Sequence, residues 1–237
     1  MRGTRILAAA LCFVAAGLCR GGNSPFPVSK VLEAPRLSLD TVPDGLRPKV
    51  KFVLDNPSLS VKGLPESVIT ATDVYRWLLD HPSIAIRLWR ELGAKVSDVE
   101  EESPGLYRWT DGQGSDIRWQ TASRTPRSHV WYAEGKVKPA PLLPASAFKA
   151  VCVLHYVEGK DGEGRSTIRH QAHFHVRCDG RAMAIAARVL GNSAPHLGEQ
   201  YLGQLQMFYG GLGWYLTQDL PRARRLLVKA GIMTAQP

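Results

Sequence analysis

The 237-residue sequence has no apolar run long enough to span a bilayer, because its longest, Ile6 to Leu18, falls short of the roughly 20 residues required. It shows no internal repeat with a period of about 20 to 50 residues, which excludes solenoids and propellers. It also lacks a GxSxG elbow, an HExxH pair, a phosphate-binding loop and a dinucleotide fingerprint. We therefore expect neither a polytopic membrane protein nor a cofactor, and no reaction is indicated.

Acidic residues are fewer than basic ones, with 21 Asp and Glu against 30 Lys and Arg, for a net charge of +9. A basic balance suits nucleic acid or an anionic membrane surface. Because the excess is spread along the chain, we expect no nucleic-acid partner, while an anionic membrane surface stays open. Hydrophobic residues at 44%, charged residues at 22% and a mean hydropathy of −0.15 are typical of a globular protein.

The N-terminus carries the pattern of an export signal. Two arginines precede the apolar run, and small residues follow it. We predict a signal peptide over residues 1–22 and a periplasmic or secreted protein. Cleavage after Gly17 and cleavage after Cys19 both fit. A permanent anchor is disfavoured by the short run, and lipidation of Cys19 is disfavoured by Leu18, which stands where a lipobox has a small residue.

Cysteine is scarce, and of the four cysteines only Cys152 and Cys178 lie beyond the predicted signal peptide. Export would permit them to form a disulfide. If 150–157 and 166–178 form a hairpin, Cys152 lies opposite residues 171–174, and Cys178 lies further along the ladder. A disulfide needs Cα atoms within about 7 Å, so this register disfavours pairing but leaves the question open.

The pattern along the chain predicts a proline-rich arm over 23–49, one α+β domain over 50–230 and a tail over 231–237. A short strand is expected over 50–54. Helices are expected over 72–79 and 83–92, followed by β-like runs over 95–100, 105–110, 116–123, 128–138, 148–157 and 166–178. Three more helices are expected over 181–190, 194–216 and 221–230.

This order of elements indicates the fold class: α+β, with a curved antiparallel sheet packed on a long C-terminal helix and an N-terminal helix pair. In that order, and in the local stretch Val74–Pro82, the chain resembles the START-like helix-grip proteins, the lipid-transfer and polyketide-cyclase relatives. The resemblance implies a ligand cavity between sheet and helix. It carries no signature motif and therefore implies no functional residue, and the helix over 181–190 departs from the pattern.

The candidate site is chosen from two patterns. Residues two apart on a strand share a face, which gives the predicted inner faces of the strands, and the long helix carries a glycine-rich stripe. The candidate ligand-binding residues, taken from the predicted inner strand faces and from that stripe, are Trp119, Trp131, His170, Phe174, Met207 and Trp214. Core packing is the alternative explanation. Large aromatics commonly fill cores, and glycines also let a helix approach a sheet closely.

Several histidines, His155, His170, His173 and His175, fall on the last two predicted strands. His173 and His175 face one way and His170 the other, so at most two of these three can share an ion. Zinc requires three or four ligands, and we expect no metal. His170 stands alone on an apolar face and needs a hydrogen-bond partner or a ligand.

The leading functional hypothesis is an exported, non-enzymatic protein that binds an apolar or amphipathic small molecule such as a lipid. One alternative is a hydrolase-like or cyclase-like enzyme that uses His170 as acid or base in the same cavity. Another is an envelope interaction protein attached by the basic helix over 221–230. In that helix we expect the apolar side, Ala223, Leu226, Leu227 and Ala230, to dock on the domain, with membrane contact secondary.

Overall fold

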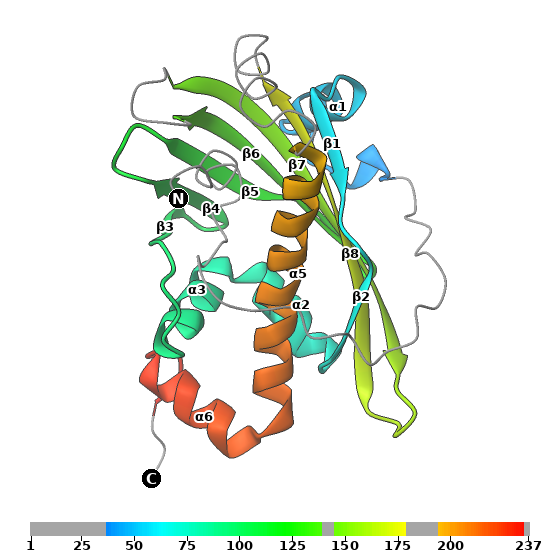
Figure 1. Ribbon diagram of the computed structural model, residues 1–237, viewed down its shortest axis with the longest axis vertical. Helices are drawn as coiled ribbons and strands as arrows, with labels where there is room; N and C mark the ends of the chain where they lie inside the picture. The colour runs from blue at the N-terminus through cyan, green and yellow to red at the C-terminus, as the bar shows by residue number, and fades with distance from the viewer. Residues whose placement is uncertain (1–36, 139–144, 179–193, 235–237) are drawn as a thin grey trace.

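The computed structural model describes residues 37–138, 145–178 and 194–234. The predicted signal peptide, the helix expected over 181–190 and the last three residues lie outside this part of the chain. Within it, one antiparallel sheet curves around a long helix (Figure 1). The α+β class with a curved sheet packed on a long C-terminal helix and an N-terminal helix pair is confirmed.

The described strands form one eight-stranded sheet in the order β1-β8-β7-β6-β5-β4-β3, while β2 pairs with a separate stretch of β8. All of these pairings are antiparallel. The strands are β1 Leu59–Lys62, β2 Glu66–Ile69, β3 Glu100–Ser103, β4 Leu106–Thr110, β5 Asp116–Thr125, β6 Ser128–Val137, β7 Ser146–Lys160 and β8 Ser166–Cys178. The expected meander is therefore present. Most strand limits lie within a few residues of the prediction, but the run expected over 95–100 shares only Glu100 with β3.

The β7–β8 hairpin sets the positions of the two cysteines. Cys152 lies opposite Phe174, and Cys178 lies opposite Phe148. The cysteines are thus on different rungs of the ladder, and no disulfide joins them. This agrees with the register expected from the sequence.

The helices α2 (Thr72–Asp80), α3 (Pro82–Glu91), α5 (Ala194–Gln218) and α6 (Leu220–Lys229) lie on the concave side of the sheet, where α5 crosses its inner face (Figure 1). The main hydrophobic core lies between that face and α5. On the apolar side predicted for α6, Ala223 and Leu226 are buried against the domain and Leu227 is partly buried. Ala230, the residue that follows the helix, is buried as well.

The strand expected over 50–54 is wrong, because these residues belong to helix α1 (Arg47–Asp55). Pro48 lies in the first turn, where proline is well tolerated, and the buried Val50 and Val53 are one helical turn apart. Both valines pack on the convex face of the sheet, beside Val151. The end of the segment assigned to the proline-rich arm is therefore helical and packed.

The edge strands β1 and β2 were not predicted. Each has four residues, and Gly63, Leu64 and Pro65 separate them. Both pair with β8, so they act as one interrupted edge strand. A four-residue run gives little periodicity, which explains why the sequence pattern did not reveal it.

The glycines of α5 let the helix approach β2 and the residue that follows it. A Cβ built on Gly210 would lie 3.3 Å from His170 Cε1 and 3.6 Å from Val68, and one on Gly213 would lie 2.6 Å from Thr70 Oγ1. Thr70 is fully buried. Close packing therefore explains Gly210 and Gly213, whose nearest partners are His170, Val68 and Thr70.

Two alanine substitutions in α5 are expected to change stability in opposite directions. Gly213→Ala should lower the free energy of unfolding by about 1 to 2 kcal/mol, because overpacking against buried Thr70 outweighs the gain in helix propensity. Gly203→Ala should raise it by up to about 1 kcal/mol, because the nearest atom to its new Cβ is Glu66 Oε1 at 3.8 Å. Urea unfolding measures both, and equal effects would contradict close packing at Gly213.

Candidate ligand-binding face

Three tryptophans form a diagonal across the inner face of the sheet, on three neighbouring strands. Trp109 on β4 lies opposite Ile117 on β5, two residues before Trp119. Trp119 lies opposite Ala133 on β6, two residues after Trp131. Diagonal neighbours in a sheet are within reach of large aromatic side chains. The register thus produces a continuous aromatic surface from positions that are far apart in the sequence.

Further rings extend this aromatic diagonal in both directions. Tyr107 stacks on Trp119 with 5.5 Å between ring centroids, and Tyr209 of α5 stacks on Trp131 at 6.0 Å. The α5 residues buried in the same core are Tyr201, Leu202, Leu205, Phe208, Tyr209, Leu212 and Leu216. The long helix therefore closes the aromatic face near Trp131.

Two of these tryptophans have a buried indole N–H group that lacks a hydrogen-bond acceptor among the described residues. Trp109 is 8% exposed and Trp131 is 5% exposed. Within the described residues, the Nε1 atom of each has no hydrogen-bond partner. Buried indole N–H groups usually find an acceptor, so an unpaired N–H at each of these two positions requires an explanation.

The six predicted site residues separate into two groups. Trp119, Trp131, His170 and Phe174 are all buried on the inner face, as strand alternation predicted. Met207 and Trp214 are 43% and 46% exposed, on the side of α5 away from the sheet. Their assignment to the inner site is therefore wrong. The side of α5 that faces the sheet carries Leu205, Tyr209 and Leu212 instead. Trp109, Tyr107 and Tyr209 belong to the face but were not among the candidates, although the period-two spacing of Tyr107 and Trp109 could have indicated them.

His170 is a buried link between three elements. Its Nδ1 is 2.5 Å from the Tyr75 hydroxyl on α2, and its Nε2 is 3.7 Å from Glu66 Oε2 on β2. Burial, and then the neighbouring Tyr209 and Tyr156, raise the pKa of Tyr75, so its hydroxyl stays protonated and can donate a hydrogen bond to Nδ1. His170 is only 1% exposed. The partner expected for this imidazole is therefore a tyrosine, and the contact joins helix to sheet.

The other three histidines of the hairpin lie on the convex face. The rings of His155 and His173 meet edge to face at 5.4 Å, and Nδ1 of His175 is 3.0 Å from Ser60 Oγ. Burial lowers the pKa of all three, that of His173 to about 4. In the part of the chain that the structure describes, no three His, Cys, Asp or Glu residues are grouped to hold a metal ion.

Scans of protein families and of curated proteins found no match to this sequence. Among solved structures, a conserved protein from Geobacillus kaustophilus is 14% identical, with a TM-score of 0.42 over 65% of this chain and 96% of that one. A protein from Rhizobium leguminosarum is 14% identical, with a TM-score of 0.39 over 64% and 93%. Norcoclaurine synthase from Thalictrum flavum is 11% identical, with a TM-score of 0.34 over 63% and 86%. The helix-grip architecture of this protein is assigned from its own strand order and from the position of α5 on the concave face of the sheet.

Proposed function

We propose that this chain is an exported, non-enzymatic protein that binds an apolar or amphipathic small molecule on the concave face of its sheet. The observation that carries the proposal is the pair of buried indole N–H groups, on Trp109 and Trp131, without acceptors among the described residues. An unpaired buried donor costs about 1 to 3 kcal/mol, so a ligand oxygen at either position would be favoured. The surrounding rings favour an apolar body.

The accessibility of β6 supports binding at this face. Beyond Trp131, the inward-facing Ala133, Gly135 and Val137 are only partly buried. Ala133 and Gly135 are small. On the neighbouring strand β5, Trp119 lies opposite Ala133 and Ile117 lies opposite Gly135. A ligand that enters along this side would meet the aromatic diagonal before it reached α5.

The enzyme alternative has less support than binding. It requires His170 to face a substrate, whereas the imidazole is 1% exposed and lies between Tyr75 and Gly210. A general acid or base must come within hydrogen-bond reach of the proton it transfers. We therefore assign His170 to the framework of the fold.

Native mass spectrometry of the protein purified from its own compartment tests both parts of the proposal. The expected result is a mature chain that has lost an N-terminal segment ending near residue 17 to 22 and that carries a small molecule with an oxygen acceptor. An intact N-terminus would overturn export. Repeated recovery of the bare chain, together with no binding of N-phenylnaphthylamine or of long-chain fatty acids, would overturn ligand binding.

Single substitutions locate the ligand on the aromatic diagonal. Trp131→Phe and Trp109→Phe keep an aromatic ring but remove the N–H donor, so each should weaken binding of a carbonyl-bearing ligand about 3-fold to 10-fold. Trp214→Phe is the matched control, because Trp214 lies on the outer side of α5. Isothermal calorimetry gives the affinities, and an equal loss in all three variants would exclude a specific role for the buried N–H groups.

A further inference from the structure

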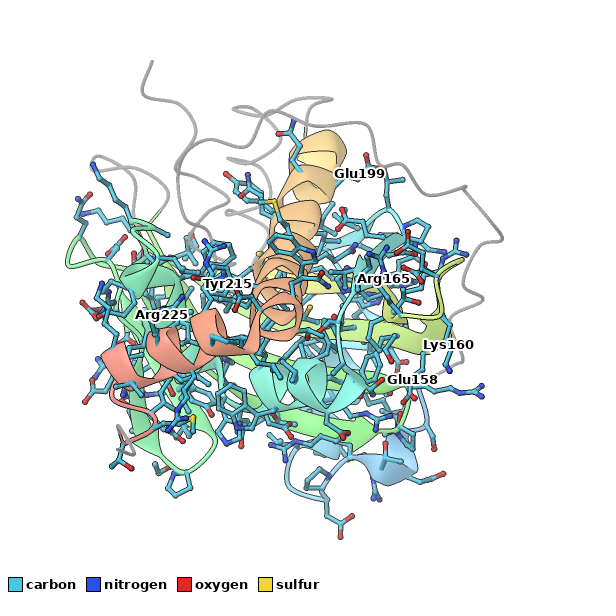
Figure 2. The ribbon with its side chains drawn as sticks, turned by 90° about the horizontal axis from the view of Figure 1, so that it is seen from below. Glu158, Lys160, Arg165, Glu199, Tyr215 and Arg225 are labelled. Carbon is cyan, nitrogen blue, oxygen red and sulfur yellow. The ribbon has the colours of Figure 1, made fainter. Side chains whose placement is uncertain are left out.

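Exposed apolar and cationic side chains gather where α5 ends and α6 begins. Trp214 on α5 is 46% exposed and Leu220, the first residue of α6, is 73% exposed. Arg222, Arg224 and Arg225 follow on the exposed surface of α6. Figure 2 shows α6 running across the end of α5, with Tyr215 and Arg225 in this region. We call these five residues, Trp214, Leu220, Arg222, Arg224 and Arg225, the α5–α6 corner.

The outward side of α5 carries no charge next to this corner. Between Glu199 and Asp219 the sequence has no Asp, Glu, Lys or Arg. Met207, two helical turns before Trp214, is on the same side and is 43% exposed. A solvent-facing helix surface normally carries charged residues, so this uncharged exposed surface favours contact with something less polar than water.

The arginines of the corner are not neutralised by the protein. Arg224 and Arg225 make no ion pair with any carboxylate in the described ranges, and Arg222 instead donates from Nε to the Tyr215 hydroxyl at 2.8 Å. Lys229, by contrast, pairs with Glu91 at 2.9 Å. The guanidinium of Arg222 also lies over the Tyr215 ring, 4.4 Å from its centroid, and that contact leaves its charge in place. The corner therefore presents three cations that no carboxylate of the described residues neutralises.

The apolar side of α6 is already used, since Ala223 and Leu226 are buried in the domain. The helix cannot lie on a bilayer by its own apolar side while the domain stays folded. Trp214 and Leu220, one on each helix, are the exposed apolar side chains beside the arginines. This composite surface does not follow from the periodicity of α6 alone.

We propose that the α5–α6 corner docks on an anionic phospholipid surface, with Trp214 and Leu220 at headgroup depth and the three arginines on lipid phosphates. Tryptophan is favoured at the membrane interface, and arginine binds phosphate in a bidentate manner. Throughout the ranges that the structure describes, no helix is long and apolar enough to cross a membrane. The attachment is peripheral and reversible, with each arginine strengthening binding about fivefold.

Co-sedimentation with phospholipid vesicles tests the corner directly. The full chain should bind phosphatidylcholine vesicles that contain phosphatidylglycerol, and should dissociate as salt rises from about 0.1 M to about 0.5 M. The triple variant Arg222→Gln, Arg224→Gln, Arg225→Gln should lose about 100-fold in affinity. Trp214→Ala with Leu220→Ser should lose at least about tenfold while the salt dependence remains.

A second triple variant, Arg127→Gln, Lys136→Gln and Lys160→Gln, is the matched control, because it removes three exposed cations from the strand side of the molecule. It should bind vesicles nearly as the unaltered chain does. Equal losses in the two triple variants would show a general charge effect and overturn the proposal, as would equal binding to vesicles of phosphatidylcholine alone. Matching melting temperatures exclude misfolding as the cause. The vesicle assay does not depend on the aromatic diagonal. Absence of vesicle binding would therefore leave the small-molecule proposal intact, and absence of a small-molecule ligand would leave the membrane proposal intact.

Discussion

Replacing Gln206 with methionine is expected to lower the free energy of unfolding by about 3 kcal/mol, although no charge changes and the side chain keeps its length. Gln206 is fully buried on α5. Its Oε1 accepts from the Ala172 N–H at 2.9 Å, and its Nε2 donates to the Leu64 C=O at 2.8 Å. The methionine would leave a buried backbone N–H of β8 unpaired.

The position of Gln206 explains why the effect should be large. Between β1 and β2 the edge strand is interrupted, and Gly63 still donates to the Ala172 C=O at 2.8 Å. The N–H of Ala172 has no edge strand to pair with, so the amide of Gln206 replaces the missing strand. A Cβ on Gly63 would lie 2.5 Å from Gln206 Oε1, which shows how closely helix and edge approach.

Urea unfolding of Gln206→Met and of Gln218→Met separates this role from a general effect on the helix. Gln218 lies on the same helix and is exposed, so its replacement should change stability by less than about 0.5 kcal/mol. Amide hydrogen exchange at Ala172 should also accelerate in Gln206→Met. Protection at Ala172 equal to that of the unaltered chain would refute the proposed pairing.

Strands β4 to β8 could be predicted well from the sequence because alternation and turn residues act locally. In β8, His170 and Phe174 were assigned to the inner face, and both are buried there. The β7–β8 register followed from the turn that joins two long strands. No information from elsewhere in the chain was needed for these assignments.

The orientation of α5 could not be predicted in the same way. Its 200–218 segment has no charged residue to mark the solvent side, and glycines lie on more than one of its faces. From this pattern alone, Gln206 and Met207 are equivalent choices for a place on the glycine stripe. The sheet decides between them: Gln206 meets Ala172 and is buried, whereas Met207 faces outward. A pattern within one helix does not contain that information.

Acid is expected to destabilise the fold steeply, and one buried histidine accounts for much of the change. His129, on β6, is 3% exposed. Its Nε2 is 3.0 Å from Thr121 Oγ1, and its Nδ1 is 3.6 Å from Asp80, a carboxylate that also pairs with Arg124 at 2.9 Å. Burial, and then the charge of Arg124, lower the pKa of His129 to about 3. The native protein thus holds this imidazole neutral across the range in which the unfolded chain protonates it.

The direction of the pH effect follows from that difference. An unfolded histidine binds its proton below about pH 6.5, whereas native His129 does so only near pH 3, so stability falls as the pH decreases through this window. Between pH 7 and pH 4 the loss from this one group should be about 3 kcal/mol. His129→Gln can keep a hydrogen bond to Thr121 and has no proton to gain. Urea unfolding of both proteins across this pH range should show a shallower decline for the variant, with a residual slope from groups such as His173. Parallel declines would mean that His129 is protonated in the native state, with Asp80 as its counterion, because an ion pair with that carboxylate would offset the cost of burying the charge.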